Sequence, residues 1–325
     1  MPEIIVISGK GGTGKTSLTA AFAHLAADAV ICDLDVDAPD LHLVLQPETD
    51  VREDFFSGHE AVIDPAACDG CGMCAEVCRF GAVTSTAAGF AVDPVKCEGC
   101  KVCVHFCPTG AIGFPERHCG EWFLSRTRFG PMVHAQLFPG AENSGRLVAL
   151  LRGKARELAK QTGRALILSD GAPGIGCPVI SSLSGADFAV LVTEPTPSGL
   201  HDLERVADLC RHFNIPTGVI VNKADLNPEN TAGLRRWCGE AGSEFLAALP
   251  YDPAVTEAMV QRQAVTEYRT DGLSADIGRV WRRIVELLDR QSNMATLDKA
   301  QAARFSLRPA SVEASLCSLS SKNNP

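Results

Sequence analysis

The chain has 325 residues, of which 46% are apolar, and carries a formal net charge of −9 at pH 7. This length suits one large α/β domain with a smaller domain inserted into it, and the apolar fraction supports a sizeable core. The negative charge argues against general binding to nucleic acid or anionic membranes. No apolar run reaches the roughly 20 residues that a membrane-spanning helix needs, so we expect no integral membrane segment.

Cysteine is unusually abundant, with 14 residues, and eight of them fall between Cys68 and Cys107. We expect no signal peptide, because residues 2–7 run directly into a glycine-rich loop. Clustered thiols without an export signal indicate metal ligation in a reducing compartment. We therefore expect a cytoplasmic metalloprotein.

Short apolar strands alternate with helices along most of the chain. The expected strands are 4–8, 29–32, 165–169, 188–193, 217–222 and 245–249, and the expected helices are 16–27, 145–162, 198–213 and one around 277–288. This alternation predicts a doubly wound, mostly parallel α/β sheet. We predict no element in the Gly-, Arg- and aromatic-rich residues after Pro115, and we expect residues 292–325 to be a weakly ordered tail.

A phosphate-binding loop is predicted between the first strand and the first helix. It fits G-x-x-x-x-G-K-[ST] and consists of Gly9, Lys10, Gly11, Gly12, Thr13, Gly14, Lys15 and Thr16. Backbone N–H groups and the helix N-terminus of such a loop face phosphate oxygens. Lys15 is expected to reach the β- and γ-phosphates, and the Thr16 hydroxyl to bind Mg²⁺. The alternative is a glycine-rich turn without a ligand.

Acidic residues follow two of the predicted strands. Asp33, Asp35 and Asp37 follow the second strand, and Asp170 directly follows the strand 165–169. In this topology the carboxyl ends of strands lie beside the phosphate loop, where carboxylates can hold Mg²⁺ or orient water. A solvated acidic turn is the alternative for the first group.

These motifs together resemble the MinD, ParA, Mrp and nitrogenase iron-protein families of P-loop ATPases. The resemblance implies that Lys10 reaches across an ATP-dependent homodimer to the nucleotide of the partner. It also implies that Asp35 positions the attacking water, while Asp33 and Asp170 serve the Mg²⁺ side. Lys10, Lys15 and Asp35 are thus the expected catalytic residues.

Two later segments resemble the nucleotide-base elements of these families. Asn222 and Lys223 resemble the N-K element that contacts adenine, and Pro250 begins a segment that resembles the late base-side loop. Each of these two matches is a weak signal alone, but both segments fall in the expected order and at strand ends.

The motif C-x₂-C-x₂-C-x₃-C occurs twice, which is typical of two-cluster ferredoxins, where the fourth cysteine of each run binds the other cluster. One 4Fe-4S cluster is assigned to Cys68, Cys71, Cys74 and Cys107, and the other to Cys97, Cys100, Cys103 and Cys78. Zinc ribbons and disulfides are the alternatives, but zinc sites usually show paired C-x₂-C. The first run ends in Cys78-Arg79 and lacks the proline that follows Cys107.

The resulting fold is a P-loop NTPase with a small α+β, bacterial-type ferredoxin insert. The ATPase is expected to comprise 1–58 and 117–291, with the insert at 59–116, which resembles MinD-superfamily ATPases that contain a ferredoxin domain. Cys177 matches the stretch that supplies a cluster-bridging cysteine in the nitrogenase iron protein, and Cys119 is its candidate companion. A third, inter-subunit cluster is one interpretation of this pair, and buried packing cysteines are the other.

Three functions are compatible with these features. The first is an ATP-gated redox protein, whose two 4Fe-4S clusters pass electrons to a partner. The second is an Mrp-type carrier that assembles or delivers clusters to a client protein. The third is a MinD-like positioning factor, which is less favoured because the last predicted helix has the pattern of a core helix and not of a membrane anchor.

Overall fold

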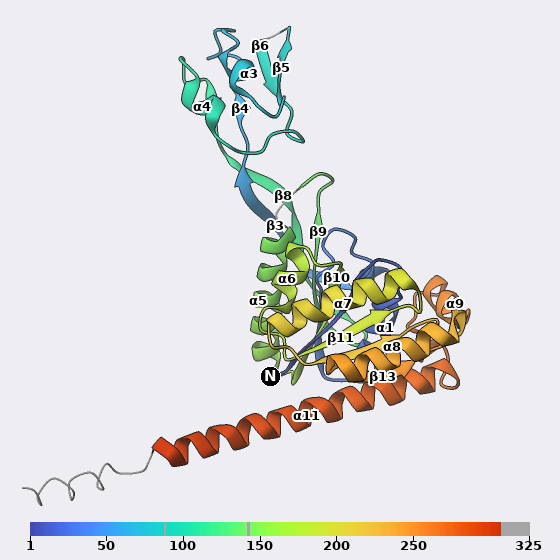
Figure 1. The fold of residues 1–325 in the computed structure, drawn as a ribbon. Helices are drawn as coiled ribbons and strands as arrows, with labels where there is room; N and C mark the ends of the chain where they lie inside the picture. The colour runs from blue at the N-terminus through green and yellow to red at the C-terminus, as the bar shows by residue number, and fades with distance from the viewer. Residues whose placement is uncertain (88, 142–143, 307–325) are drawn as a thin grey trace, which may run out of the picture. The chain divides into compact units, whose positions relative to one another are not determined.

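The computed structural model describes residues 1–87, 89–141 and 144–306, with side chains as far as Arg290. The chain divides into two units, Met1–Trp281 and the residues from Arg282 onward. In the first unit, nine strands form one sheet in the order β13-β12-β11-β1-β10-β2-β9-β8-β3 (Figure 1). All neighbours from β13 to β9 are parallel, whereas β8 pairs antiparallel with both β9 and β3. The predicted mostly parallel sheet is confirmed.

The main sheet and its helices have the following bounds. The strands are β1 (Glu3–Ser8), β2 (Ala29–Asp33), β3 (Glu48–His59), β8 (Glu116–Thr127), β9 (Gly130–Leu137), β10 (Leu166–Pro173), β11 (Phe188–Thr193), β12 (Thr217–Val221) and β13 (Glu244–Ala248). The helices are α1 (Lys15–Ala26), α2 (Leu41–Leu45), α5 (Ser144–Thr162), α6 (Cys177–Leu183), α7 (Pro197–His212), α8 (Pro228–Ala241), α9 (Ala254–Val260), α10 (Val265–Tyr268) and α11 (Leu273–Ser306), with a 3₁₀ turn at Ala224–Leu226.

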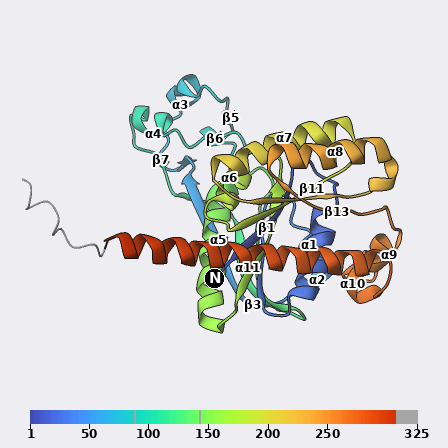
Figure 2. The ribbon, with the colours of Figure 1, turned by 60° about the horizontal axis from the view of Figure 1, so that its bottom comes forward.

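The central strands are buried on both faces, as their continuous β-branched composition predicts. All six residues of β1 and all six of β11 are buried. Helices α5, α6, α7 and α8 bury their apolar residues in one cluster with these strands. Figures 1 and 2 show α7 and α8 side by side on one side of the sheet. Helix α7 begins with a capping residue, because the Thr196 side chain accepts a hydrogen bond from the Gly199 N–H and Pro197 occupies the next position.

Residues 60–115 lie between β3 and β8 and form a small core of their own around Cys74, Cys103 and Ile112. This segment contains β4 (Val62–Ile63), α3 (Met73–Val77), β5 (Val83–Thr86), β6 (Gly89–Val92), α4 (Val102–Phe106) and β7 (Ile112–Gly113). The strands form two small antiparallel pairs, β4 with β7 and β5 with β6. Each of the two short helices begins after a residue in the left-handed region, Gly72 before α3 and Lys101 before α4.

The structure contains several elements that were not predicted, among them β3. Residues after Pro115 were expected to be irregular, but they form β8 and β9, which join the sheet with β3. Helix α11 continues to Ser306, so residues 292–306 of the predicted tail are helical. Their composition explains this, because they hold good helix formers such as Ala, Leu, Lys and Gln and no Gly or Pro. The rest of that prediction, residues 307–325, lies outside the described residues.

No helix in the described part of the chain is long and apolar enough to cross a membrane.

Candidate functional site

The predicted phosphate loop is a tight turn between β1 and α1. Gly12 and Gly14 have φ of +79° and +89°, which glycine adopts at little cost. A Cβ atom on Gly14 would lie 2.4 Å from Nδ2 of Asn222, so this position also has no room for a side chain. The same Asn222 Nδ2 donates a hydrogen bond to the Thr13 carbonyl at 2.8 Å. The side chain of Asn222 in the N-K element therefore stabilises the backbone of the loop.

Lys15 is buried at the loop's end and is surrounded by carboxylates. Its Nζ lies 3.0 Å from Asp170 Oδ2 and 3.4 Å from Asp35 Oδ2. Burial alone would lower the pKa of Lys15, but the negative charges of Asp170, Asp35 and Asp33 outweigh it and raise that pKa. The ammonium is thus firmly charged and lies where a phosphate group would compete with these carboxylates for it.

The candidate Mg²⁺ ligands converge at the ends of β2 and β10, where Asp33 and Asp170 are neighbours in register. Asp170 accepts hydrogen bonds from the Thr16 hydroxyl at 2.7 Å and from the Thr19 hydroxyl at 2.8 Å. Asp33 is buried, and its Oδ2 has no hydrogen-bond partner in the described structure. Burial and the charge of Asp170 raise the pKa of Asp33 well above its usual range.

An orphaned carboxylate oxygen beside a second carboxylate and a hydroxyl is a donor set that a hard divalent cation satisfies. The residues present therefore fit Mg²⁺. Thr19, which the sequence analysis did not single out, lies one helical turn after Lys15 and fixes the second oxygen of Asp170.

Lys10 is turned toward its own chain. Its Nζ lies 3.3 Å from Glu194 Oε2 and 3.4 Å from the hydroxyl oxygens of Thr196 and Ser198. Glu194 also pairs with Lys223 Nζ at 2.5 Å. Burial would raise the pKa of Glu194, but the two lysines outweigh it and lower that pKa. Sequence reasoning missed Glu194, although an acid directly after a buried strand is the signal that revealed Asp33 and Asp170.

A separate cavity of about 270 Å³ lies beside the phosphate loop. Gly12, Asn222 and Pro250 line it, together with apolar residues of α1, α9 and the start of α11 and with one acid, Asp252. Its position next to the loop and its mainly apolar wall suit a nucleotide base. The base-contact role of Asn222, Lys223 and Pro250 stays a prediction.

The eight clustered cysteines line two cavities in the small inserted core. One cavity is lined by Cys68, Cys71, Cys74 and Cys107, and the other by Cys78, Cys97, Cys100 and Cys103. Each cavity therefore receives three cysteines from one run and the fourth from the other run. Four thiols per cavity are the donor set that a 4Fe-4S cluster takes, and the assignment of a cluster to each set stays a prediction.

The backbone around the cysteines also suits sulfur ligands. Burial would raise the pKa of the Cys107 thiol, but hydrogen bonds from the Thr109 hydroxyl and from the N–H groups of Ala111, Thr109 and Gly110 lower it. No group of three or more His, Cys, Asp or Glu among the described residues could hold a single metal ion. A cubane differs from a single ion because each of its cysteines binds a different iron, so the thiols need not converge on one point.

The proposed companions Cys119 and Cys177 lie in different surroundings. Cys119 is buried on β8, and its thiol donates to the Ser57 carbonyl at 3.2 Å. Cys177 is exposed and begins α6. The bridging cluster stays a prediction, and the packing of Cys119 favours the alternative interpretation for that residue. Cys32, Cys210 and Cys238 are buried core residues, and Cys317 lies outside the described residues.

The family model for the CobQ/CobB/MinD/ParA nucleotide binding domain matches residues 4–265. The chain is 33% identical over 232 residues to protein MJ0578 of Methanocaldococcus jannaschii. The matched region covers 70% of this chain and 80% of that protein. A shorter match, 31% identical over 107 residues, links it to the cytosolic Fe-S cluster assembly factor Nubp1 homolog of Drosophila grimshawi. That match covers 28% of this chain and 34% of the fly protein.

Solved structures of MinD share the fold. The cell division ATPase MinD of Pyrococcus furiosus gives a TM-score of 0.52 at 19% identity, covering 88% of this chain and 100% of that one. MinD of Pyrococcus horikoshii, solved in complex with Mg-ADP, gives 0.54 at 17% identity, covering 88% and 96%.

Proposed function

Because the chain belongs to the CobQ/CobB/MinD/ParA nucleotide-binding family, we propose that it is an ATPase that couples nucleotide state to redox chemistry at two 4Fe-4S clusters. The observation that carries the iron–sulfur half of this proposal is the pair of cavities, each lined by a crossed set of four cysteines. The clusters would supply one-electron transfer. ATP binding would govern when that transfer takes place.

The chain's own residues suggest how ATP is handled. The β- and γ-phosphates replace Asp170 and Asp35 as the partners of Lys15, whose charge is already held in place. Thr16, Asp170 and Asp33 would hold Mg²⁺, which would offset the negative charge of the phosphates. Once Lys15 turns to the phosphates, the carboxylate of Asp35 is released to orient the attacking water.

A homodimer completes the proposed site. Lys10 is half-buried against Glu194, so it must leave this ion pair to reach a nucleotide on a second copy. The departure of Lys10 leaves Lys223 to neutralise Glu194, because Lys223 already binds its other oxygen. Lys10 can therefore leave Glu194 without creating a buried, unpaired acid.

The connections of the inserted segment provide a path for coupling. Strand β2 ends at Asp33, the chain then passes through Asp35 into α2, and β3 leads from α2 directly to the cysteines. The return strand β8 pairs with β9, which in turn pairs with β2. A shift of the segment after β2 on ATP binding therefore acts on both strands that carry the insert.

Anaerobic iron and sulfide analysis with EPR, with and without Mg-ATP, tests this proposal. We expect about eight irons and eight sulfides per chain, two interacting reduced clusters, and a change in their signals or potentials on addition of Mg-ATP. Protein purified under strict anaerobiosis without iron and sulfide would contradict the cluster assignment. Intact clusters that do not respond to Mg-ATP would contradict the coupling.

Cluster assembly is the second candidate function, and two observations favour it. The similarity to the Nubp1 homolog, which is named a cytosolic Fe-S cluster assembly factor, is one. The other is Cys177, an exposed thiol at the start of α6, close after the strand that carries Asp170.

The two functions differ in what Cys177→Ala changes. If the protein delivers clusters, this variant should lose transfer of a labile cluster to an apo-ferredoxin while keeping its eight resident irons. Cys210→Ala, which removes a buried cysteine far along the chain, is the control and should transfer normally. Equal transfer by Cys177→Ala and the unaltered protein would rule out a carrier role for this thiol.

A further inference from the structure

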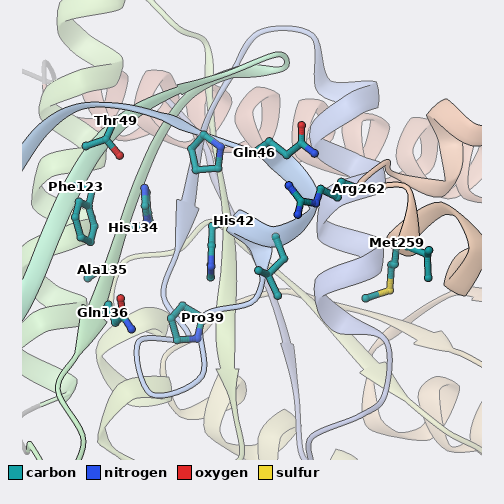
Figure 3. A pocket seen from close by; sticks show the side chains of 13 residues that line it. Pro39, His42, Gln46, Thr49, Phe123, His134, Ala135, Gln136, Met259 and Arg262 are labelled. Carbon is teal, nitrogen blue, oxygen red and sulfur yellow. The ribbon is translucent and has the colours of Figure 1, made fainter.

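A large pocket lies where α2 faces strands β8 and β9 (Figure 3), and it shares one lining residue, Met259, with the cavity beside the phosphate loop. Its volume is about 640 Å³, which is within the range of small-molecule sites. The lining comes from Pro39–Thr49, from Phe123 and His134–Gln136, and from Met259–Arg262. None of the 13 lining residues belongs to the phosphate loop, the Mg²⁺ ligands or the cysteine runs.

The polar lining favours a negatively charged ligand. Arg262, His42 and His134 line the pocket with the carboxamides of Gln46 and Gln136, and no lining residue is a carboxylate. Within the described residues, the guanidinium of Arg262 forms no ion pair or hydrogen bond, and the two carboxamides form none either. These groups are available to a ligand, and a guanidinium suits the planar oxygens of an anion.

Arg262 brings a permanent positive charge to the pocket. Burial and the neighbouring His42 lower the pKa of His134 to about 4, so this ring is neutral near pH 7. Its Nε2 is already hydrogen-bonded to the Ser125 hydroxyl at 2.9 Å. His134 therefore offers a neutral ring to a ligand, and Arg262 is the lining residue with a permanent positive charge.

Flat rings and exposed apolar side chains form part of the pocket wall. The rings of Phe123 and His134 stack at 4.9 Å between centroids, and His42 lies nearly parallel to His134 with an angle of 7°. Leu43, Met259 and Val260 are large apolar side chains that remain exposed at the rim. Flat rings and exposed apolar groups favour a ligand with a planar body.

Arg128, at the turn between β8 and β9, fixes the walls in advance. Its guanidinium donates to the carbonyls of Val44 and Leu45 at the end of α2, at 3.1 Å and 3.0 Å. It also donates to the carbonyl of Arg262 at 3.1 Å and to both oxygens of Glu267 at 2.7 Å. One side chain thus joins three segments around the pocket, so a ligand would meet a preformed site.

We propose that this pocket binds a small planar organic anion, whose acidic group is held by Arg262 and whose ring stacks on the His134 and Phe123 side. Binding there is independent of the proposed ATPase and iron–sulfur functions. The walls include α2, which directly follows the segment of Asp35, and Thr49 at the base of β3. An occupant therefore contacts both the nucleotide-responsive segment and the strand that leads to the cysteines.

The test uses two dyes with the same apolar body, 8-anilinonaphthalene-1-sulfonate and its uncharged analogue N-phenyl-1-naphthylamine. Titrations on the whole protein are followed by fluorescence, with saturating Mg-ADP to occupy the nucleotide site. We expect one saturable site for the sulfonate. Arg262→Gln should weaken binding of the sulfonate by about tenfold, as expected for one lost charge-assisted contact, and leave binding of the neutral dye unchanged.

Two further variants complete the test. Gln136→Trp fills the pocket from an exposed lining position and should abolish sulfonate binding, while Arg236→Gln on α8 removes an equal charge elsewhere and should have no effect. The proposal is overturned if Arg262→Gln and Gln136→Trp leave sulfonate binding unchanged. It is equally overturned if Arg262→Gln weakens both dyes alike, since the site would then recognise only the apolar body.

Discussion

Lys15→Ala is expected to abolish ATP hydrolysis and to weaken ATP binding by at least about a hundredfold. Lys15 is the buried cation of the phosphate loop, and each charge-assisted contact that it makes to a phosphate oxygen contributes about 1.5–3 kcal/mol. Two such contacts together contribute about 3 kcal/mol or more, which corresponds to a weakening of ATP binding by about a hundredfold or more. The loss also leaves Asp170 and Asp35 without their shared counter-ion, so the variant presents an unscreened negative site to an anionic ligand.

Calorimetry with a non-hydrolysable ATP analogue measures binding, and phosphate release measures turnover. Lys10→Ala is the informative comparison, because Lys10 pairs with Glu194 and lies outside the carboxylate group around Lys15. This second variant should retain binding within a few-fold and lose turnover, since its role is proposed to lie across the dimer. Tight binding of the analogue by Lys15→Ala would contradict the nucleotide assignment.

Paired cysteine variants should reveal which thiols share a cluster. In Cys68→Ala/Cys107→Ala both changes fall on one cavity, so about four of about eight irons should remain. In Cys68→Ala/Cys78→Ala the changes fall on both cavities, so nearly all iron should be lost. The two double variants remove the same number of thiols and are therefore matched controls for each other.

Iron content and EPR spin quantification after anaerobic purification give the result directly. If each run of four cysteines held its own cluster, the outcomes would be reversed, and Cys68→Ala/Cys78→Ala would be the variant that keeps half its iron. Loss of all iron from both variants would show that neither cluster survives without the other.

The nucleotide half of the molecule was predictable because its signals are local. The strand before the loop is a buried β-branched run, the loop has a fixed spacing, and Asp33 and Asp170 directly follow short apolar runs within their strands. The cysteine spacing was equally informative, because three thiols with two residues between neighbours leave one position of each cluster for the other run. The partners of Lys10 were not predictable, because Glu194 lies far away in sequence and meets it only through the pairing of β1 with β11.

Strands β3, β8 and β9 were missed for a different reason. Most residues of β3 are exposed, so its sequence lacks the alternation that marks a half-buried strand. It is held mainly by pairing with β8 across long sequence separation. The pocket around Arg262 could not be predicted for the same reason, because three segments that are distant in sequence meet there only once these strands have joined the sheet.

The point at which the cysteine-bearing segment leaves the sheet has an evolutionary consequence. His59 and Glu116 face each other in the ladder between β3 and β8, so the chain departs and returns at one place. A short hairpin turn could close the same ladder, and replacing it with some 56 residues costs only about 3 kcal/mol in loop-closure entropy. An inserted segment can therefore be gained, lost or exchanged here while the main sheet keeps its fold.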